Sequence, residues 1–469
     1  MINMELPEGL KNRISAGEIV TSGVCPLHCE YCYIPKHSSM KEMHKKIEED
    51  IVSNKIFDTI EKFYGKDMQH LGFWGTEPYL TLPLLQTKIE YILDRFPKLS
   101  TTNLSTSGLL DQQILIDYIV ELERICKLKD RTYSMDVQIS VDGPSWITDK
   151  NRQEGASDAV PKALYKLVGL LNNCKLDKVK VDIRFKSTIS IDNMREFNKQ
   201  ISLIDEYFKY FSVMEDTFLK ESKNTNVKLQ EGSGSPTIVV PGKYIVQDGK
   251  DFAQYLYNLK RLGYGSSYED RFHRSFDMGY DISDRRTTTC SGANSNFGIS
   301  GNNIMLCHRS FFYDNKEYVD SILKDNNIEN WDVSLFESGS LKNIQKYFIV
   351  DSTDTDALIR FIYAARSYHD FWKMQNSYIR AMVMEMARSS QAEERFLHDS
   401  AYVDLFAAFI NTATSCPMEN LLNTGSLQTI PISLIRFFAN GAFAIIVEGF
   451  EKKYGIYANE LRTRGKQNE

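Results

Sequence analysis

The first half of the chain alternates short apolar runs with longer segments in which apolar residues recur every three or four positions. The short runs predict strands at 18–21, 71–74, 99–104, 135–141, 179–188 and 227–230. The longer segments predict helices at 48–64, 80–95, 111–127, 158–172 and 193–210. Such alternation favours parallel strands joined by right-handed crossovers. We therefore expect an α/β fold in the form of a partial (β/α)6 TIM-like barrel.

The second half of the chain has a different pattern. The run Glu-Gly-Ser-Gly-Ser-Pro at 231–236 is the clearest break and predicts the exit from the barrel. A segment with many Gly, Ser and Thr residues follows, and from about residue 316 the apolar spacing is helical. We therefore predict a barrel at 1–235, a small region at 236–315 and an α-helical C-terminal domain at 316–469.

Charge and composition exclude several classes of protein. The 469 residues carry a net charge of −6, whereas a domain that coats nucleic acid is usually basic, so we expect no nucleic-acid partner. No apolar stretch reaches the roughly 20 residues of a membrane-spanning helix, and the first residues lack a signal-peptide pattern. We expect a cytoplasmic protein without a membrane partner.

Eight cysteines are present, and only Cys25, Cys29 and Cys32 are clustered. In a long chain from a reducing compartment, clustered cysteines indicate metal binding or catalysis rather than disulfides. Thiolates at this spacing after a strand can hold three irons of a [4Fe–4S] cluster and leave the fourth iron open for another ligand. A zinc site completed by His28 or His37 is the alternative interpretation.

The run Cys25-x3-Cys29-x-Tyr31-Cys32 resembles the cluster motif of the radical S-adenosylmethionine superfamily. The resemblance implies that the open iron binds the methionine moiety of S-adenosylmethionine. It also implies that an electron from the cluster cleaves the sulfonium to give a 5′-deoxyadenosyl radical. Tyr31 would then pack beside the adenine. An electron donor such as flavodoxin or ferredoxin is expected as a partner.

Two further segments resemble cofactor-binding motifs of the same superfamily, at the ends of the second and third strands. Gly75-Thr76-Glu77 resembles a Gly-Gly-Glu-Pro segment whose backbone and Glu meet the methionine amino group. Thr76 departs from the usual second Gly, although a small residue is retained. Ser107 takes the place of the Asn in a Thr-Asn-Gly turn. A hydroxyl-rich turn that caps the next helix is compatible with the same residues.

The fourth strand ends in Ser-x-Asp-Gly-Pro, a pattern that resembles the peptide-modifying branch of the superfamily. The resemblance implies that Ser140 points toward the ribose and that Arg152 pairs with the methionine carboxylate. Asp142 is expected to order the turn. On the fifth strand, alternation directs Lys186 and Arg184 toward the mouth of the barrel, where either could neutralise a carboxylate. The resemblance covers about residues 17–240.

The segments around Cys290 and Cys307 resemble the start of the auxiliary-cluster region called SPASM, or its shorter form called twitch. In that region two cysteines flank a small hairpin with a Gly near its turn, here Gly301. Only Cys290, Cys307 and Cys416 follow residue 240, too few for a full SPASM region. They could hold one auxiliary [4Fe–4S] cluster, with an open iron or with His308. Buried thiols without a cluster, and a thiol that donates a hydrogen atom in catalysis, are the alternatives.

These resemblances favour an enzyme of ribosomal-peptide maturation, which abstracts a hydrogen from a peptide substrate. The outcome would be epimerisation or a carbon–carbon or thioether crosslink. Few residues precede Cys25, so the helical tail or a separate protein is expected to recognise the peptide. A radical dehydrogenase of a sugar or alcohol is one alternative. A non-enzymatic iron–sulfur redox sensor is a second alternative, which does not explain Glu77, Ser140 and Arg152.

Overall fold

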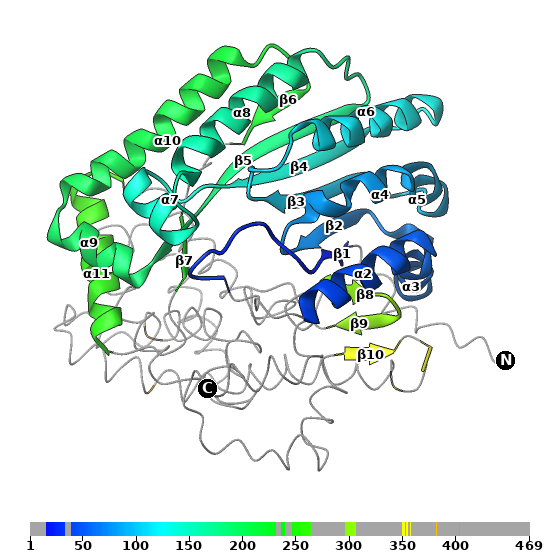
Figure 1. The fold of residues 1–469 in the computed structure, drawn as a ribbon, viewed down its shortest axis with the longest axis horizontal. Coiled ribbons are helices and arrows are strands. Elements are labelled where there is room, and N and C mark those ends of the chain that lie inside the picture. Colours follow the sequence, from blue (N-terminus) through cyan, green and yellow to red (C-terminus); the bar gives the residue numbers. More distant parts are fainter. Residues whose placement is uncertain are drawn as a thin grey trace, which may run out of the picture.

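A computed structural model describes residues 16–32, 39–230, 236–239, 246–264, 296–305 and 349–351, together with 353, 354, 357, 381 and 403. These residues form an open α/β sheet with helices along one side (Figure 1). The strands are β1 (Ala16–Ser22), β2 (His70–Gly75), β3 (Thr101–Thr106), β4 (Tyr133–Ser140), β5 (Val179–Ser190), β6 (Val227–Leu229), β7 (Pro236–Val239), β8 (Asn296–Ser300), β9 (Asn303–Met305) and β10 (Ile349–Asp351).

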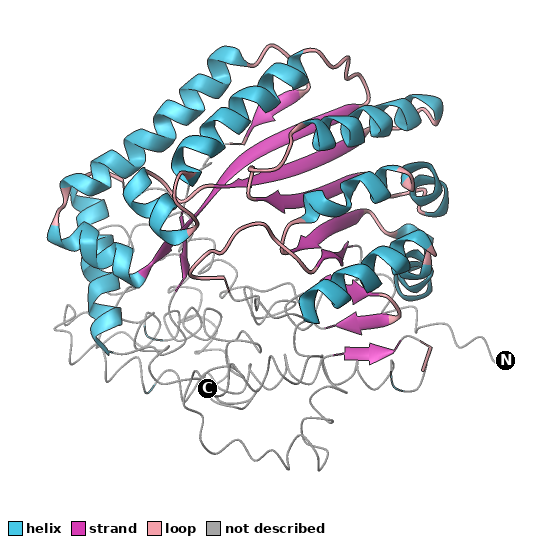
Figure 2. Cartoon of the chain, in the orientation of Figure 1, coloured by secondary structure: helices cyan, strands magenta, loops and turns pink. Residues whose placement is uncertain are grey.

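The strands β1 to β6 lie side by side in sequence order, and each neighbouring pair is parallel. Figure 2 shows them as one twisted sheet with the helices on its outer side. The sheet is open, because its path runs from β10 at one end to β6 at the other. The predicted α/β fold and partial TIM-like barrel are therefore confirmed.

The helices connect successive strands and cover the outer face of the sheet. They are α2 (Ser39–Val52), α3 (Lys55–Tyr64), α4 (Leu82–Gln86), α5 (Ile89–Arg95), α6 (Gln113–Leu128), α7 (Ser145–Asn151), α8 (Ala156–Asn172), α9 (Ile191–Lys199), α10 (Ser202–Glu221) and α11 (Val246–Arg261), with 3-10 turns η1 (Gly65–Asp67) and η2 (Pro78–Thr81). Three predicted helices are each divided, and the one predicted at 80–95 is formed by η2, α4 and α5. Asn54, with a φ of 64°, separates α2 from α3, and Gln200, in an extended conformation, separates α9 from α10.

The two faces of the sheet differ in polarity. Along β3 and β4, buried and partly exposed residues alternate strictly, as a strand with one covered face requires. Most of the buried positions carry apolar side chains that pack against the helices, while Thr102 and Thr106 on β3 are buried hydroxyl residues. Leu104 and Val137 are fully buried there, as are Leu71 and Ile183 on the neighbouring strands. The partly exposed positions carry hydroxyl, amide and charged groups. The inner face is thus polar, unlike the packed apolar interior of a closed (β/α)8 barrel.

Residues beyond the predicted barrel boundary also join this sheet. After the Gly-Ser run, β7 pairs with the last residues of β5, so the chain has not yet left the sheet at residue 235. The strand β8 pairs with β1 in parallel, and β9 and β10 continue outward from it. The strands β7, β8 and β9, which fall in the predicted region 236–315, thus extend the barrel sheet, and the predicted domain boundaries stay predictions. The helical domain predicted at 316–469 lies almost entirely outside the described residues.

The predicted hairpin between Cys290 and Cys307 is formed by β8 and β9. Its turn contains Gly301, whose φ of 55° is readily adopted by glycine. The helix α3 fixes the hairpin from outside: Thr59 donates a hydrogen bond to the carbonyl of Gly301 at 2.7 Å. The buried hydroxyl of Tyr64 donates to the carbonyl of Phe297 at 3.1 Å and accepts from its N–H at 3.2 Å.

Candidate functional site

The predicted site residues gather where the parallel strands β1 to β5 end. Carboxyl ends of parallel strands share one edge of a sheet, which is where barrels build active sites. The loop that follows β1 carries Cys25, Cys29 and Cys32, which we call the cysteine loop (residues 23–32). Cys25 and Cys29 are partly buried, Cys32 is exposed, and none of the three is in a disulfide.

The three thiols of the cysteine loop lie within each other's electrostatic reach. Burial raises the pKa of Cys25 to about 12, and the neighbouring Glu77, Cys29 and Cys32 add to this increase. Burial also raises the pKa of Cys29, while the charge of Arg152 opposes the increase. Three thiolates so placed repel one another unless cations lie between them, and iron supplies that charge. The donor set therefore fits an iron–sulfur cluster held by three cysteines.

Among the described residues, no group of three or more His, Cys, Asp or Glu side chains has the geometry to hold one metal ion. His37, one of the two histidines of the alternative zinc site, lies outside the described residues.

The start of the cysteine loop is fixed to the end of β2. Gly75 pairs with Ser22 so closely that a Cβ atom on Gly75 would lie 2.4 Å from the carbonyl oxygen of Ser22. The next residue, Thr76, donates its N–H to the same carbonyl at 3.1 Å. The Thr76 hydroxyl donates to the carbonyl of Val24 and lies 3.1 Å from the hydroxyl of Ser22. Thr76 therefore holds the backbone one residue before Cys25.

Glu77 joins the ends of β2 and β3. Its side chain is fully buried, and Oε2 accepts the backbone N–H of Ser107 at 2.9 Å. Burial raises the pKa of this carboxyl, although hydrogen bonds from Ser107, Thr106 and Tyr79 oppose the increase. The two residues were predicted separately from two motifs, and the structure brings them together. Glu77 is thus held beside Cys25, near enough for their charges to interact.

Asp142 is the centre of the largest polar network at this edge. It is fully buried, and its oxygens accept two hydrogen bonds from Arg152, at 2.8 and 2.9 Å. They also accept the hydroxyl of Tyr31 at 2.9 Å and the backbone N–H of Thr188 at 2.9 Å. Burial and the charge of Asp142 raise the pKa of the Tyr31 phenol well above its usual range. The sequence indicated only a turn-ordering role for Asp142, because its partners are distant along the chain.

Ser140 and Lys186 are neighbours on the polar inner face. The register of β4 and β5 pairs them directly, so both side chains lie on one face at the end of the sheet. Two residues earlier on β5, Arg184 donates to Asp136 at 2.8 Å and forms an ion pair with it. The guanidinium of Arg184 is therefore paired with the carboxylate of Asp136.

The remaining predicted residues cannot be placed. Cys290, Cys307 and Cys416 lie outside the described residues, as does His308. The auxiliary cluster therefore stays a prediction.

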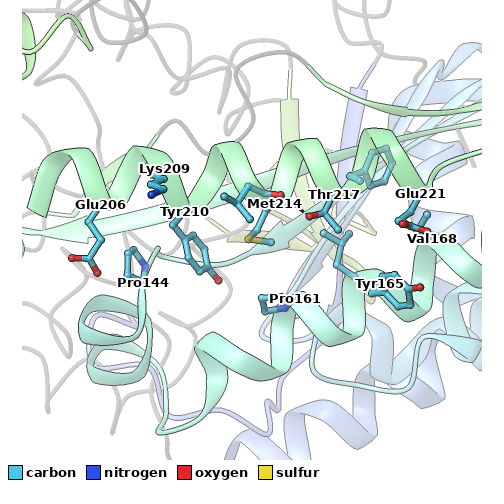
Figure 3. A pocket seen from close by; sticks show the side chains of 13 residues that line it. Pro144, Pro161, Tyr165, Val168, Glu206, Lys209, Tyr210, Met214, Thr217 and Glu221 are labelled. Atoms are coloured by element: carbon cyan, nitrogen blue, oxygen red, sulfur yellow. Dashed lines mark hydrogen bonds between the residues drawn. The ribbon is translucent and has the colours of Figure 1, made fainter.

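An apolar groove of about 370 Å³ lies elsewhere, between α8 and α10 on the outer side of the barrel (Figure 3). Val168, Met214 and Phe218 line it, and Glu206 and Lys209 stand toward one end. None of the predicted site residues lines this groove. It is distinct from the edge that carries the cysteine loop.

None of the described helices combines the length and the apolar character that a bilayer span requires.

Comparisons with known proteins give only distant similarity. No protein-family model matches the sequence, and no curated protein matches it. Among solved structures, native anSMEcpe with bound AdoMet is similar at 17% identity and a TM-score of 0.35, over 62% of this chain and 74% of that chain. SuiB of Streptococcus suis bound to S-adenosylmethionine is similar at 11% identity and a TM-score of 0.31, over 64% and 61%.

Proposed function

We propose that this chain is a radical S-adenosylmethionine enzyme whose catalytic [4Fe–4S] cluster is held by Cys25, Cys29 and Cys32. The observation that carries the proposal is the position of three cysteine thiols at the carboxyl edge of a partial barrel, beside the buried Glu77 and Ser107. A structural cluster would have no need for Glu77, Ser107 and Ser140 at the ends of three successive strands. When bound, the cluster supplies the electron that cleaves S-adenosylmethionine and generates the radical.

The protein's own residues would orient the cofactor. The carboxyl of Glu77 lies within electrostatic reach of Cys25, which suits recognition of an amino group. Ser107 is fixed beside them by its hydrogen bond to Glu77. Ser140 and Lys186 lie together further along the edge and can bind hydroxyl and carboxylate groups. An external electron donor such as flavodoxin or ferredoxin would reduce the cluster.

For the substrate we propose a peptide. The inner face of the sheet carries amide and hydroxyl groups, including Ser105, Gln138 and Ser140, that can pair with a polar chain. The Ser-x-Asp-Gly-Pro pattern at the end of β4 supports the same choice. Hydrogen abstraction from the peptide would lead to epimerisation or a crosslink. A separate peptide-recognition protein is a further expected partner.

The test is the formation of 5′-deoxyadenosine by anaerobically reconstituted protein given S-adenosylmethionine and dithionite. Cys25→Ala is expected to abolish product. Cys174→Ala is the matched control, because Cys174 lies just after α8 and its thiol donates to the carbonyl of Leu170. Product from the Cys25→Ala variant at the wild-type rate would overturn the proposal. Loss of product in both variants would indicate that removal of any thiol inactivates the chain, and the assignment of Cys25 would fall.

A further inference from the structure

We infer that Asp142 and Arg152 form a clamp on Tyr31 that fixes the second half of the cysteine loop before any cluster is bound. The inference rests on the proposed function, because it assigns these residues a role toward the same cluster site. The clamp is defined as Tyr31, Asp142 and Arg152. Tyr31 lies between Cys29 and Cys32, so whatever holds its side chain also holds both thiols near their positions.

The hydrogen bonds of Asp142 leave it no capacity for another ligand. Oδ1 accepts from Nη2 of Arg152 at 2.8 Å and from the backbone of Thr188 at 2.9 Å. Oδ2 accepts from Nε of Arg152 and from the hydroxyl of Tyr31, both at 2.9 Å. A carboxylate has about four acceptor positions, and all four are filled. Asp142 is therefore a positioning residue.

Arg152 is committed to the clamp in two ways. The Nε–Nη2 edge that a guanidinium uses for bidentate recognition is occupied by Asp142. Its planar head lies over the ring of Tyr31, 5.7 Å from the centroid. A methionine carboxylate could reach only the other edge of the guanidinium, formed by Nη1 and the second N–H of Nη2. The pairing of Arg152 with the cofactor, predicted from the sequence, would have to use that edge and stays a prediction.

A backbone contact strengthens the same attachment. The N–H of Glu30 donates to the carbonyl of Asn151 at 2.8 Å, and Asn151 ends α7 immediately before Arg152. The cysteine loop is thus joined to the end of α7 by a backbone bond at Glu30 and to the loop after β4 by a side-chain bond at Tyr31. Such preorganisation favours cluster binding, because the loop does not have to be ordered when iron arrives.

The experiment compares Tyr31→Phe with Tyr210→Phe. The first substitution removes only the hydroxyl that bonds Asp142. The second removes a hydroxyl that bonds the carbonyl of Ser157 in α8 instead of the clamp or the cysteine loop. In the cluster-free chain, amide hydrogen exchange of a peptide spanning 27–32 is expected to be about tenfold faster in Tyr31→Phe, as loss of a charge-assisted bond implies. Tyr210→Phe is expected to exchange like the wild type.

A second readout uses the reconstituted chains without S-adenosylmethionine. Chelator-driven loss of iron is expected to be several-fold faster in Tyr31→Phe and in Arg152→Lys, which keeps the charge but loses the planar fork. Wild-type rates of exchange and of iron loss in Tyr31→Phe would overturn the clamp. Arg152→Lys with normal iron retention and weakened cofactor binding would overturn it too, in favour of the carboxylate role. Because hydrogen exchange is measured without iron, its outcome is independent of whether the proposed function holds.

Discussion

Replacement of Gly75 by Ala tests whether the close contact between β1 and β2 is as tight as the structure requires. An added Cβ would lie 2.4 Å from the carbonyl oxygen of Ser22 and 2.7 Å from its nitrogen. Both are backbone atoms of a buried strand, so no side chain can move aside. The φ of Gly75 is 147°, a conformation that costs an Ala residue about 1–3 kcal/mol. Forcing the strands apart adds about 1–3 kcal/mol.

We therefore expect Gly75→Ala to lower the free energy of unfolding by about 4 kcal/mol. Two controls separate the contributions. Gly155 has a φ of 81° but nothing within 4 Å of the added Cβ, so Gly155→Ala is expected to cost only about 1 kcal/mol. Gly169 lies in α8 with open space around it, and Gly169→Ala is expected to stabilise the chain by about 1 kcal/mol.

The assay is urea denaturation of the cluster-free chains, followed by fluorescence, with Trp74 next to the substituted position. With a slope near 3 kcal/mol/M, the midpoint of Gly75→Ala is expected about 1.3 M below that of the wild type. A midpoint equal to that of Gly155→Ala would refute the reasoning, because backbone conformation alone would then explain the loss.

Three further predictions concern the residues around the site and the hairpin. Thr76→Val removes the hydroxyl that bonds the carbonyl of Val24, so hydrogen exchange of the cysteine loop is expected to be up to about tenfold faster. Thr76→Ser keeps the hydroxyl and is expected to behave like the wild type. Equal exchange in the two variants would contradict the role of the Thr76 hydroxyl in holding the loop. Because burial raises the pKa of Cys25 to about 12, its alkylation rate in the cluster-free chain is expected to rise about tenfold per pH unit between about pH 8 and 10. The rate is measured by mass spectrometry of the peptide that carries Cys25. A plateau of the rate near pH 9 would show that the pKa of this thiol is not raised. Tyr64→Phe leaves the N–H and carbonyl of Phe297 without their hydroxyl partner. The free energy of unfolding is therefore expected to fall by about 2–4 kcal/mol in the same urea assay. An unchanged midpoint would mean that α3 does not fix the hairpin.

The strands were predictable because alternation along each strand follows directly from which face is covered. The six predicted strands all appear in the sheet, and the cysteine loop follows the first of them as expected. The divided helices were not predictable in the same way. The sequence around Asn54 continues the helical apolar spacing, and only the left-handed conformation of Asn54 interrupts it.

Pairing between distant segments was the part that the sequence did not reveal. Nothing in the sequence of residues 296–300 specifies β1 as the neighbour of β8. The Gly-Ser run at 231–235 predicts that the chain leaves the barrel there, although β7 pairs with β5 directly afterwards. The same is true at the site. Asp142 reads locally as a turn residue, and its partners Tyr31 and Thr188 are 111 and 46 positions away. Motifs identified the individual residues, whereas the fold determined which of them bond to each other.

The central claim is that Cys25, Cys29 and Cys32 hold a [4Fe–4S] cluster. Its most direct test is iron per chain after anaerobic reconstitution, in the wild type and in the variant with all three cysteines replaced by Ala. The account predicts that the variant binds about four irons fewer than the wild type, whether or not Cys290, Cys307 and Cys416 hold a second cluster. Equal iron content in the two proteins would contradict it.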